Sequence, residues 1–473
     1  MPGFTSGENR YELKQLLQQY KNLREGTGHS FLDEDSFEII INYFDEKDKL
    51  SAALEAAETG IEQHPYSAVL LFQKADLLIV SRKYQEALNV LERAGILDST
   101  DINLYILKTD AWLALDQPDK AVEMLERALE IFEGEEKIEL LFEMADVYDD
   151  YEEFDKVFDC LKMILEQEPE NDEALYKICF WTDFTGRNEE GITLHKKIID
   201  EYPYNELAWF NLASAFQGLK LYEKAIDAYK YALVIDEKFD YAYRNMGDAL
   251  IRLRKYREAI EALEKVLELS RPEEVIYEAI GHCYDRLKNP AQARFYYRKA
   301  SHLNPDNSRM YYKIACTYIF EKQWRSAIKQ LEVALRIQRN QAEYNQAMAE
   351  CYARLEDYRE AINHYTAALF VRPKSHRIWQ SFIRCLYDGE YYEEAYTQVH
   401  AALAAAGPKP VFLFYVAVIL FALGRPKEAL LQLEHAMETS PSSLKYLFEL
   451  NPGLLQRQQV VDVVARYKKS RRI

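Results

Sequence analysis

Apolar residues recur along this chain at the spacing of amphipathic helices, in pairs joined by short turns. Two sets of apolar residues in 206–239 each fall on one face of a predicted helix: Leu207, Phe210, Leu212, Ala213 and Phe216 in the first, and Ala225, Ile226, Tyr229, Ala232 and Leu233 in the second. Residues 218–222 break the first helix and begin the second. Because a hairpin of two such helices cannot bury its apolar face alone, we expect it to pack against similar neighbours.

This hairpin pattern repeats with a period of 34 residues. Alanine takes the same place at positions 53, 87, 121, 225, 259, 293, 327, 361, 395 and 429, and Val157 and Gly191 take it in the two remaining units after a slip of two residues. The units then begin at residues 34, 68, 102, 138, 172, 206, 240, 274, 308, 342, 376 and 410. A period of this length predicts an all-α solenoid of stacked hairpins.

The large and small residues at fixed places carry a family resemblance: Trp209, Leu212, Ala213, Phe216, Ala225, Tyr229 and Ala232 in one unit, and Tyr277, Ile280, Gly281, Tyr284, Ala293, Tyr297, Ala300 and Pro305 in another. In these residues the chain resembles the tetratricopeptide repeat (TPR) family, over residues 34–443. The resemblance implies a right-handed superhelix of about twelve helical hairpins that binds protein segments in a concave inner groove. It also implies that the first helix of each hairpin lines this groove, at places 2, 5, 9 and 12 of the unit.

Carrying those places onto this chain gives a candidate partner-binding groove. Its residues are Phe72, Asp76, Ile106, Asp110, Phe142, Asp146, Tyr176, Phe180, Phe210, Tyr241, Arg244, Arg309 and Tyr312, with further arginines at 377 and 384. The first half of this groove combines apolar residues with aspartates, which suits a basic segment with apolar anchors. The arginines of the second half would instead accept acidic residues. An alternative is that these inner residues pack on one another or are simply solvated.

The two ends of the chain predict caps for the array. In residues 1–33, the apolar positions Leu13, Leu16, Leu17, Tyr20 and Leu23 share one face of a helix over 11–24, which stops at residues 26–28. In residues 444–473, a short helix over 444–450 precedes a final helix over 454–467, with Leu454, Val461 and Val464 apolar and a basic tail at 468–472. Terminal repeats need polar covers, so we expect capping helices, with a partner-docking helix or a basic anchor as the alternatives.

Residues 102–195 are the least regular part of the array. Lys108 and Thr109 replace the expected apolar and small residues, and Thr182 replaces an aromatic one. Two interpretations remain open: a tolerated slip with a lengthened helix end, or a softer joint between two stiffer arms.

Charge divides the chain in two. Residues 1–200 hold 45 acids and 20 bases, a balance of −25, whereas residues 201–473 hold 33 acids and 39 bases, a balance of +6; together they give the net charge of −19. This asymmetry favours partners of opposite sign for each half. The six cysteines include no CxxC pair and lie about one repeat apart, so we expect reduced thiols and a cytoplasmic protein. No stretch approaches the length of a membrane helix.

The sequence contains no pattern typical of catalysis. It has no phosphate-binding glycine loop, no GxSxG, no HExxH and no metal-spaced cluster of cysteine and histidine. Scattered histidines such as His195 and His364 are expected to be packed or surface residues. With no enzyme domain flanking the array, we expect no catalytic activity, no cofactor and no metal.

The sequence therefore predicts a non-enzymatic scaffold or adaptor that binds other proteins or peptides, with a chaperone-like role as one variant. One alternative is a receptor that responds to a short signalling peptide. A helical-repeat RNA-binding protein is disfavoured, because such proteins need a positive inner surface and the first half offers aspartates. Neither the partner nor the oligomeric state can be predicted.

Overall fold

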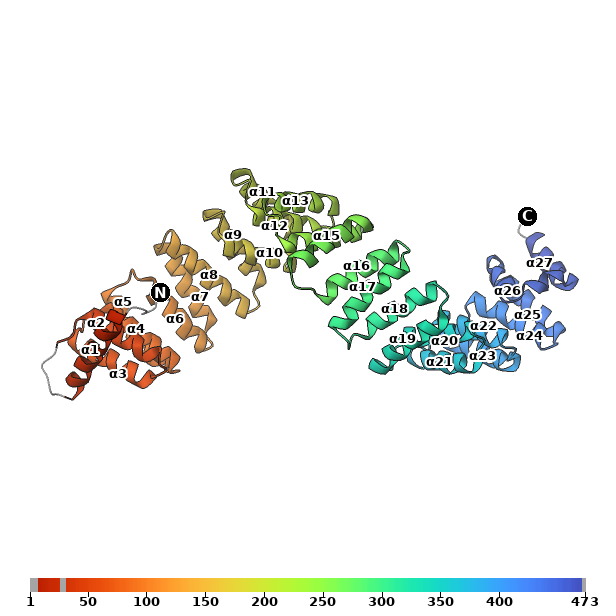
Figure 1. Ribbon diagram of the computed structural model, residues 1–473, viewed down its shortest axis with the longest axis horizontal. Coiled ribbons are helices and arrows are strands. Elements are labelled where there is room, and N and C mark those ends of the chain that lie inside the picture. Colours follow the sequence, from red (N-terminus) through yellow and green to blue (C-terminus); the bar gives the residue numbers. More distant parts are fainter. Residues whose placement is uncertain (1–6, 26–30, 470–473) are drawn as a thin grey trace. The chain divides into compact units, whose positions relative to one another are not determined.

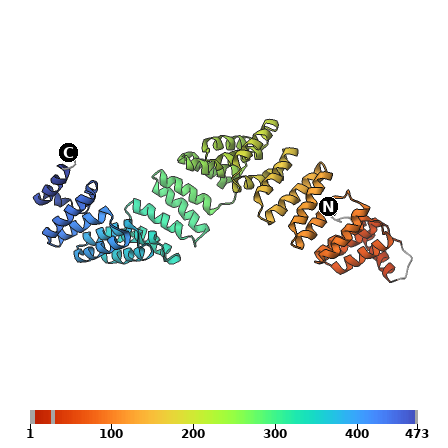
Figure 2. The same cartoon turned by 180° about the vertical axis from the view of Figure 1, so that it is seen from behind.

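The computed structural model describes residues 7–25 and 31–469, and the regular structure of these residues is helical. The predicted helix stop at residues 26–28 and the end of the basic tail, residues 470–473, lie outside the described residues. The chain divides into two compact units, Met1–Glu237 and Lys238–Ile473, which we describe separately. Within each unit, helices that follow one another in sequence lie side by side as antiparallel hairpins (Figure 1), and Figure 2 shows the same order from behind.

The helices of the first unit have these bounds: α1 (Gly7–Arg24), α2 (Glu34–Asp45), α3 (Leu50–Gln63), α4 (Ala68–Val80), α5 (Tyr84–Leu97), α6 (Ile102–Ala114), α7 (Pro118–Ile131), α8 (Glu135–Asp150), α9 (Phe154–Gln167), α10 (Asp172–Phe184), α11 (Asn188–Glu201), α12 (Glu206–Gly218) and α13 (Tyr222–Ile235). The even-numbered members from α2 onward are the first helices of hairpins and the odd-numbered members from α3 onward are the second helices. The all-α solenoid predicted from the repeat is therefore confirmed.

The helices of the second unit follow the same alternation: α14 (Asp240–Arg252), α15 (Tyr256–Leu269), α16 (Glu274–Arg286), α17 (Pro290–Leu303), α18 (Ser308–Phe320), α19 (Trp324–Ile337), α20 (Ala342–Arg354), α21 (Tyr358–Val371), α22 (His376–Asp388), α23 (Tyr392–Ala406), α24 (Pro410–Ala422), α25 (Pro426–Thr439), α26 (Lys445–Leu450) and α27 (Gln458–Lys469), with short 3-10 helices at Pro441–Ser443 and Pro452–Gln456. The division of the chain into twelve repeats with a cap at each end stays a prediction.

A polar side chain begins several of the first helices, and a residue in the left-handed conformation follows the end of many of them. The Asn205 side chain accepts a hydrogen bond from the Ala208 amide at 2.7 Å, which satisfies one of the free N–H groups at the start of α12. At the other end, Lys220 has φ of 61°, and the Leu221 amide donates to the Phe216 carbonyl at 2.9 Å. This arrangement closes the helix and reverses the chain.

Small residues allow the two helices of a hairpin to approach closely. A Cβ atom placed on Gly281 of α16 would lie 2.7 Å from the Tyr297 ring of α17, and that ring is itself buried. A Cβ on Gly247 of α14 would lie 2.8 Å from Leu263 of α15. Each large residue of a second helix thus fills space that the small residue opposite leaves open.

The α10–α11 hairpin departs from this pattern. Helix α10 packs mainly against α9 and α12 and only slightly against α11. Thr182 of α10, at the place of an aromatic residue in other units, is buried, and its methyl group would lie 2.8 Å from a Cβ on Gly191 of α11. In this hairpin a threonine and a glycine therefore meet where most other units have a larger apolar side chain.

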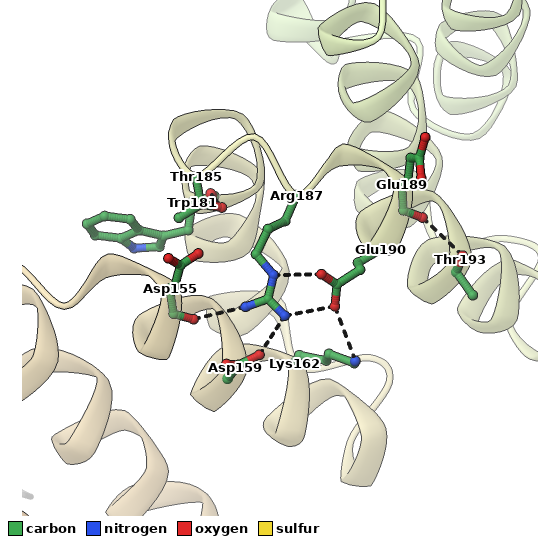
Figure 3. A network of polar contacts seen from close by, with 9 residues as sticks. All are labelled: Asp155, Asp159, Lys162, Trp181, Thr185, Arg187, Glu189, Glu190 and Thr193. Carbon is green, nitrogen blue, oxygen red and sulfur yellow. Dashed lines mark hydrogen bonds and ion pairs between the residues drawn. The ribbon is translucent and has the colours of Figure 1, made fainter.

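Polar contacts join α11 to α9 instead (Figure 3). The Arg187 guanidinium donates to both Glu190 carboxylate oxygens, at 2.8 and 2.7 Å, and to the Asp155 carbonyl at 3.0 Å. It also pairs with the Asp159 carboxylate at 2.7 Å and lies 4.2 Å from the centre of the Phe158 ring. This network fixes the turn between α10 and α11 on the surface of α9.

We expect Arg187→Ala to lower the free energy of unfolding of the first unit by about 1–2 kcal/mol, because it removes several charge-assisted hydrogen bonds at once. Arg187→Lys should give a smaller loss, since it keeps the charge but not the planar fork. Urea denaturation followed by circular dichroism measures both. An Arg187→Ala protein as stable as the wild type would show that the network contributes nothing.

The slip inside residues 102–195 coincides with a lengthened first helix. The softer joint in this stretch stays a prediction. Helix α8 begins at Glu135, three residues before the predicted unit start at 138, because residues 135–137 continue the helix.

The terminal helices pack on their neighbouring hairpins. Tyr20 of α1 is buried against Phe37 of α2, with ring centres 6.4 Å apart. At the other end, α26 contacts α24 and α27 contacts α25. Of the apolar residues that the sequence shows in this last segment, Leu454 is buried and Val461 is exposed, and Val460 and Val463 are buried as well. The helix begins at Gln458 after a 3-10 turn, not at 454, and this changes which residues face the core.

Over the described residues, we find no helix that combines the length and the apolar character needed to cross a membrane.

Candidate binding site

A row of carboxylates follows the first helices of the first unit. Asp45 of α2, Asp76 of α4, Asp110 of α6 and Glu143 of α8 lie close enough to repel one another. Partial burial, followed by the charge of Asp45, raises the pKa of the Asp76 carboxyl, and partial burial followed by Asp76 raises that of Asp110. Glu143 shows the same rise, from burial and then from Asp110 and its neighbours on α8. The sequence therefore places like charges side by side on successive helices.

Within the described part of the chain, neither Asp76 nor Asp110 forms an ion pair. One cation meets the end of the row: the Lys177 ammonium of α10 lies 3.6 Å from the Asp146 carboxylate and 3.0 Å from that of Glu173. It also lies 5.0 Å from the centre of the Phe142 ring. The row thus keeps an excess of negative charge that would attract a cationic partner.

Helix α10 continues the row with aromatic rings. Tyr176, Phe180 and Phe184 follow at intervals of four residues on one helical face, and their side chains are 70%, 60% and 56% exposed. The Phe180 and Phe184 rings stack at 5.6 Å, and the half-buried rings of Trp181 and Phe154 contact Phe184 at 5.6 and 4.9 Å. Rings held in place by such contacts form a firm apolar surface that no described residue covers.

We define the first-helix face of the first unit as the surface made by these groups: Asp76, Asp110, Glu143, Asp146, Tyr176, Phe180 and Phe184. Five of these residues were predicted from the repeat places: Asp76, Asp110, Asp146, Tyr176 and Phe180. Glu143 and Phe184 were missed. Phe184 lies one helical turn beyond Phe180, so the spacing of four residues could have shown it. Trp181 meets Phe154 of another helix, and no sequence signal predicts that contact.

The other predicted residues of the first unit are less accessible. Phe72 is only 6% exposed, so it supports the face and does not offer a contact surface. The helix that carries Phe72, α4, contacts the first helices on both sides of it, α2 and α6. Ile106, Phe142 and Phe210 are half-buried, and the Phe210 ring lies 5.7 Å from that of Tyr229.

The predicted residues of the second unit have partners of their own. The Arg244 guanidinium pairs with Glu273 at 3.1 Å, and Arg309 approaches Glu278 at 3.7 Å. Tyr312 stacks on Tyr344 at 4.9 Å between ring centres, whereas Tyr241 is exposed. The arginines expected to accept acidic partner residues are thus already near acids of the same chain, as are Arg384 and Asp388 at 3.8 Å.

His195 and the six cysteines, which lie outside this face, are packed rather than reactive. His195 of α11 is fully buried, and neither ring nitrogen has a hydrogen-bond partner among the described residues. Burial lowers its pKa to about 3. All six cysteines are free and at least half-buried, and burial raises the pKa of each thiol, for example to about 11 for Cys179 and Cys316. Thiols held neutral in this way are poor nucleophiles. No group of three potential metal ligands occurs within residues 7–25 and 31–469.

Comparison with known families identifies the repeat. Sequence models described as tetratricopeptide repeat match residues 207–239, 240–272, 286–351 and 346–374. The chain is a tetratricopeptide repeat protein. The matched TPR segments lie within residues 207–374. No curated protein matches the chain in sequence.

Solved TPR structures resemble parts of the fold. The crystal structure of YrrB, titled as a TPR protein with an unusual peptide-binding site, is 21% identical, covers 39% of this chain and 94% of its own, and has a TM-score of 0.35. The Cut9–Hcn1 hetero-tetramer of the APC/C is 14% identical, with 90% and 97% covered and a TM-score of 0.35. The C-terminal part of a TPR protein from Cytophaga hutchinsonii is 14% identical, with 54% and 99% covered and a TM-score of 0.44.

Proposed function

We propose that this TPR protein is a non-enzymatic scaffold that binds extended or helical protein segments on the first-helix face of the first unit. The partner segment carries basic residues that pair with the carboxylates and apolar residues that rest on the aromatic rings. The observation that carries the proposal is the exposed aromatic row Tyr176, Phe180 and Phe184. Aromatic side chains of this kind form the centres of protein interfaces, and nothing within the described chain covers them.

The electrostatics support a basic partner. Partial burial, and then the charge of neighbouring carboxylates, raises the pKa of Asp110 and Glu143, so an incoming cation stabilises their ionised forms more than it stabilises those of isolated surface acids. A cationic side chain beside a phenylalanine or tyrosine ring gains a further contribution of about 0.5–2 kcal/mol. The same negative charge repels phosphate, so we propose proteins or peptides as partners and not nucleic acid.

The proposal also includes that the protein has no catalytic activity and that it lies in a reducing compartment. The buried, unpaired thiols fit a reducing compartment such as the cytoplasm. No titratable group of the face is arranged with a nucleophile among the described residues, and the raised pKa values of Asp76, Asp110 and Glu143 follow from partial burial and then from neighbouring carboxylates. A chaperone-like or adaptor role fits this surface, and it requires only binding.

The test removes the aromatic row without disturbing the core. We expect Phe180→Ala/Phe184→Ala to weaken binding of short basic-apolar peptides by about tenfold or more, because it removes the apolar contact area. Fluorescence anisotropy with labelled peptides of repeated Lys-Leu and Arg-Leu pairs measures the change. Phe370→Ala is the matched control, since this ring is 88% exposed on a second helix of the other unit. Equal binding by all three proteins would refute the site.

A further inference from the structure

The chain supplies a cation of its own to the first-helix face. The Lys177 ammonium of α10 lies 3.6 Å from the Asp146 carboxylate of α8, 3.0 Å from the Glu173 carboxylate and 5.0 Å from the centre of the Phe142 ring. Carboxylates and a ring around one ammonium are also the groups that would bind a lysine or arginine side chain of a partner. We call Phe142, Asp146 and Glu173 the cation subsite; it is built by the successive first helices α8 and α10.

The cation subsite is accessible from solvent. The side chains of Asp146 and Glu173 are 67% and 62% exposed, and that of Lys177 is 34% exposed. Ion pairs and cation–π contacts at such exposure are individually weak, because water and salt screen the charges. A cation from a partner segment can therefore take the place of the Lys177 ammonium, which then returns to water.

Lys177 also reduces the negative charge at the end of the carboxylate row. Its charge opposes the rise in the pKa of Glu143 that burial, Asp110 and the other acids of α8 produce. Burial lowers the pKa of Lys177 itself, but the hydrogen bond to Glu173 and the charge of Asp146 outweigh burial, so this pKa is raised. The ammonium therefore stays charged at neutral pH and cancels part of the charge that attracts a basic partner.

We propose that the cation subsite binds a lysine or arginine side chain of the partner, and that Lys177 occupies it in the free protein as an internal competitor. This inference rests on the proposed function and adds the place where a partner cation binds and a residue that limits the affinity. Lys177 follows Tyr176 directly, and Phe180 lies three residues further along the same helix, so the subsite adjoins the exposed rings. The competing interpretation is that Lys177 only fastens α10 to α8.

Lys177→Met in the full chain separates these interpretations, because methionine keeps an apolar side chain beside Phe142 and removes the charge. We expect labelled peptides of repeated Lys-Leu pairs to bind this variant about three- to fivefold tighter than the wild type, measured by fluorescence anisotropy. Peptides with glutamine in place of lysine should show no such gain. Adding Asp146→Asn should remove most of the gain, because it removes a carboxylate of the subsite. Lys162→Met is the matched control, since the Lys162 side chain is also 34% exposed and lies 3.7 Å from the Glu190 carboxylate, on the second helix α9 and outside the face.

The remaining outcomes refute the inference or the proposed function separately. Equal binding by the wild type and Lys177→Met, or an equal gain in Lys162→Met, would overturn the competitor, while a loss of binding in Phe180→Ala/Phe184→Ala would leave the proposed function standing. Weaker binding by Lys177→Met together with a lower melting temperature would show that Lys177 holds the face together and would equally overturn the competitor. Lys177→Gln, which keeps a polar side chain, must show the same gain as Lys177→Met. If the Lys-Leu peptides bind to none of these proteins, the proposed function itself fails.

Discussion

Replacing the carboxylate row by its amides, in Asp76→Asn/Asp110→Asn/Glu143→Gln, is expected to weaken binding of basic peptides and at the same time to stabilise the fold. Three charge pairs of the usual surface strength together correspond to a loss of roughly 30-fold in affinity. The pKa of each carboxyl is raised in the folded protein, so its ionised form is disfavoured there, and a neutral amide removes this cost. We expect a rise in melting temperature of about 2–4 °C.

The opposite signs of these two changes distinguish a binding surface from a structural feature. Peptide anisotropy and thermal denaturation, measured on the same preparation, test both. Asp227→Asn is the control, because it removes the charge of an exposed carboxylate on a second helix, outside the row. A variant that loses stability together with binding would show that the row supports the fold, and a variant that binds normally would exclude the row from the interface.

The row also predicts a dependence of binding on pH. The folded pKa values lie above the ordinary 3.8 of aspartate and 4.5 of glutamate, so these groups become protonated at a higher pH than free carboxylates as the solution is acidified. Binding of a cationic peptide should therefore fall in that window, while the contribution of the row to stability improves, because protonation relieves the repulsion.

Replacing His195 by leucine is expected to stabilise the first unit, with the largest gain in acid. The corresponding second-helix residues of other units are Leu91, Leu125, Leu161, Tyr229 and Leu263, and all of them are buried. At neutral pH, leucine removes two buried nitrogen atoms that have no partner among the described residues, a change of about 1–3 kcal/mol.

The acid dependence follows from the pKa of about 3 in the folded protein against 6.5 for an ordinary histidine. The unfolded chain takes up a proton below pH 6.5 and the folded chain does not until about pH 3. The stability of the wild type is therefore complete above pH 6.5 and declines as the pH falls, by about 2 kcal/mol at pH 5. Urea denaturation at pH 8 and pH 5 measures this loss.

His195→Leu should lose less stability than the wild type between these pH values. His302→Leu, at an exposed histidine of α17 in the other unit, is the control and should follow the wild type. If the two variants show the same decline from pH 8 to pH 5, the acid sensitivity comes from groups other than His195.

Most of the fold was predictable because it is local. The period of 34 residues, the helical spacing within Glu206–Gly218 and the small residues at places such as Gly281 each describe contacts between residues close in the sequence. The candidate site was predictable in part: Asp76, Asp110, Tyr176 and Phe180 lie at the repeat places that the family resemblance assigns to the groove. Their positions in the repeat predicted a shared surface. The positions did not predict which side chains on that surface are exposed.

The tertiary structure decided what depends on contacts between helices. Phe72 is buried although its place matches that of the exposed Tyr176, because burial follows the packing of neighbouring helices and not the place in the repeat. The contact of Trp181 with Phe154 and the Arg187 network arise across α9, α10 and α11, where Thr182 leaves the usual apolar contact unmade. The sequence by itself determined the repeat, the helical hairpins and the acidic character of the first half. The raised pKa values of the row and the exposed aromatic face were decided by the packing of successive helices, since distances between side chains on different helices are fixed only when those helices come together.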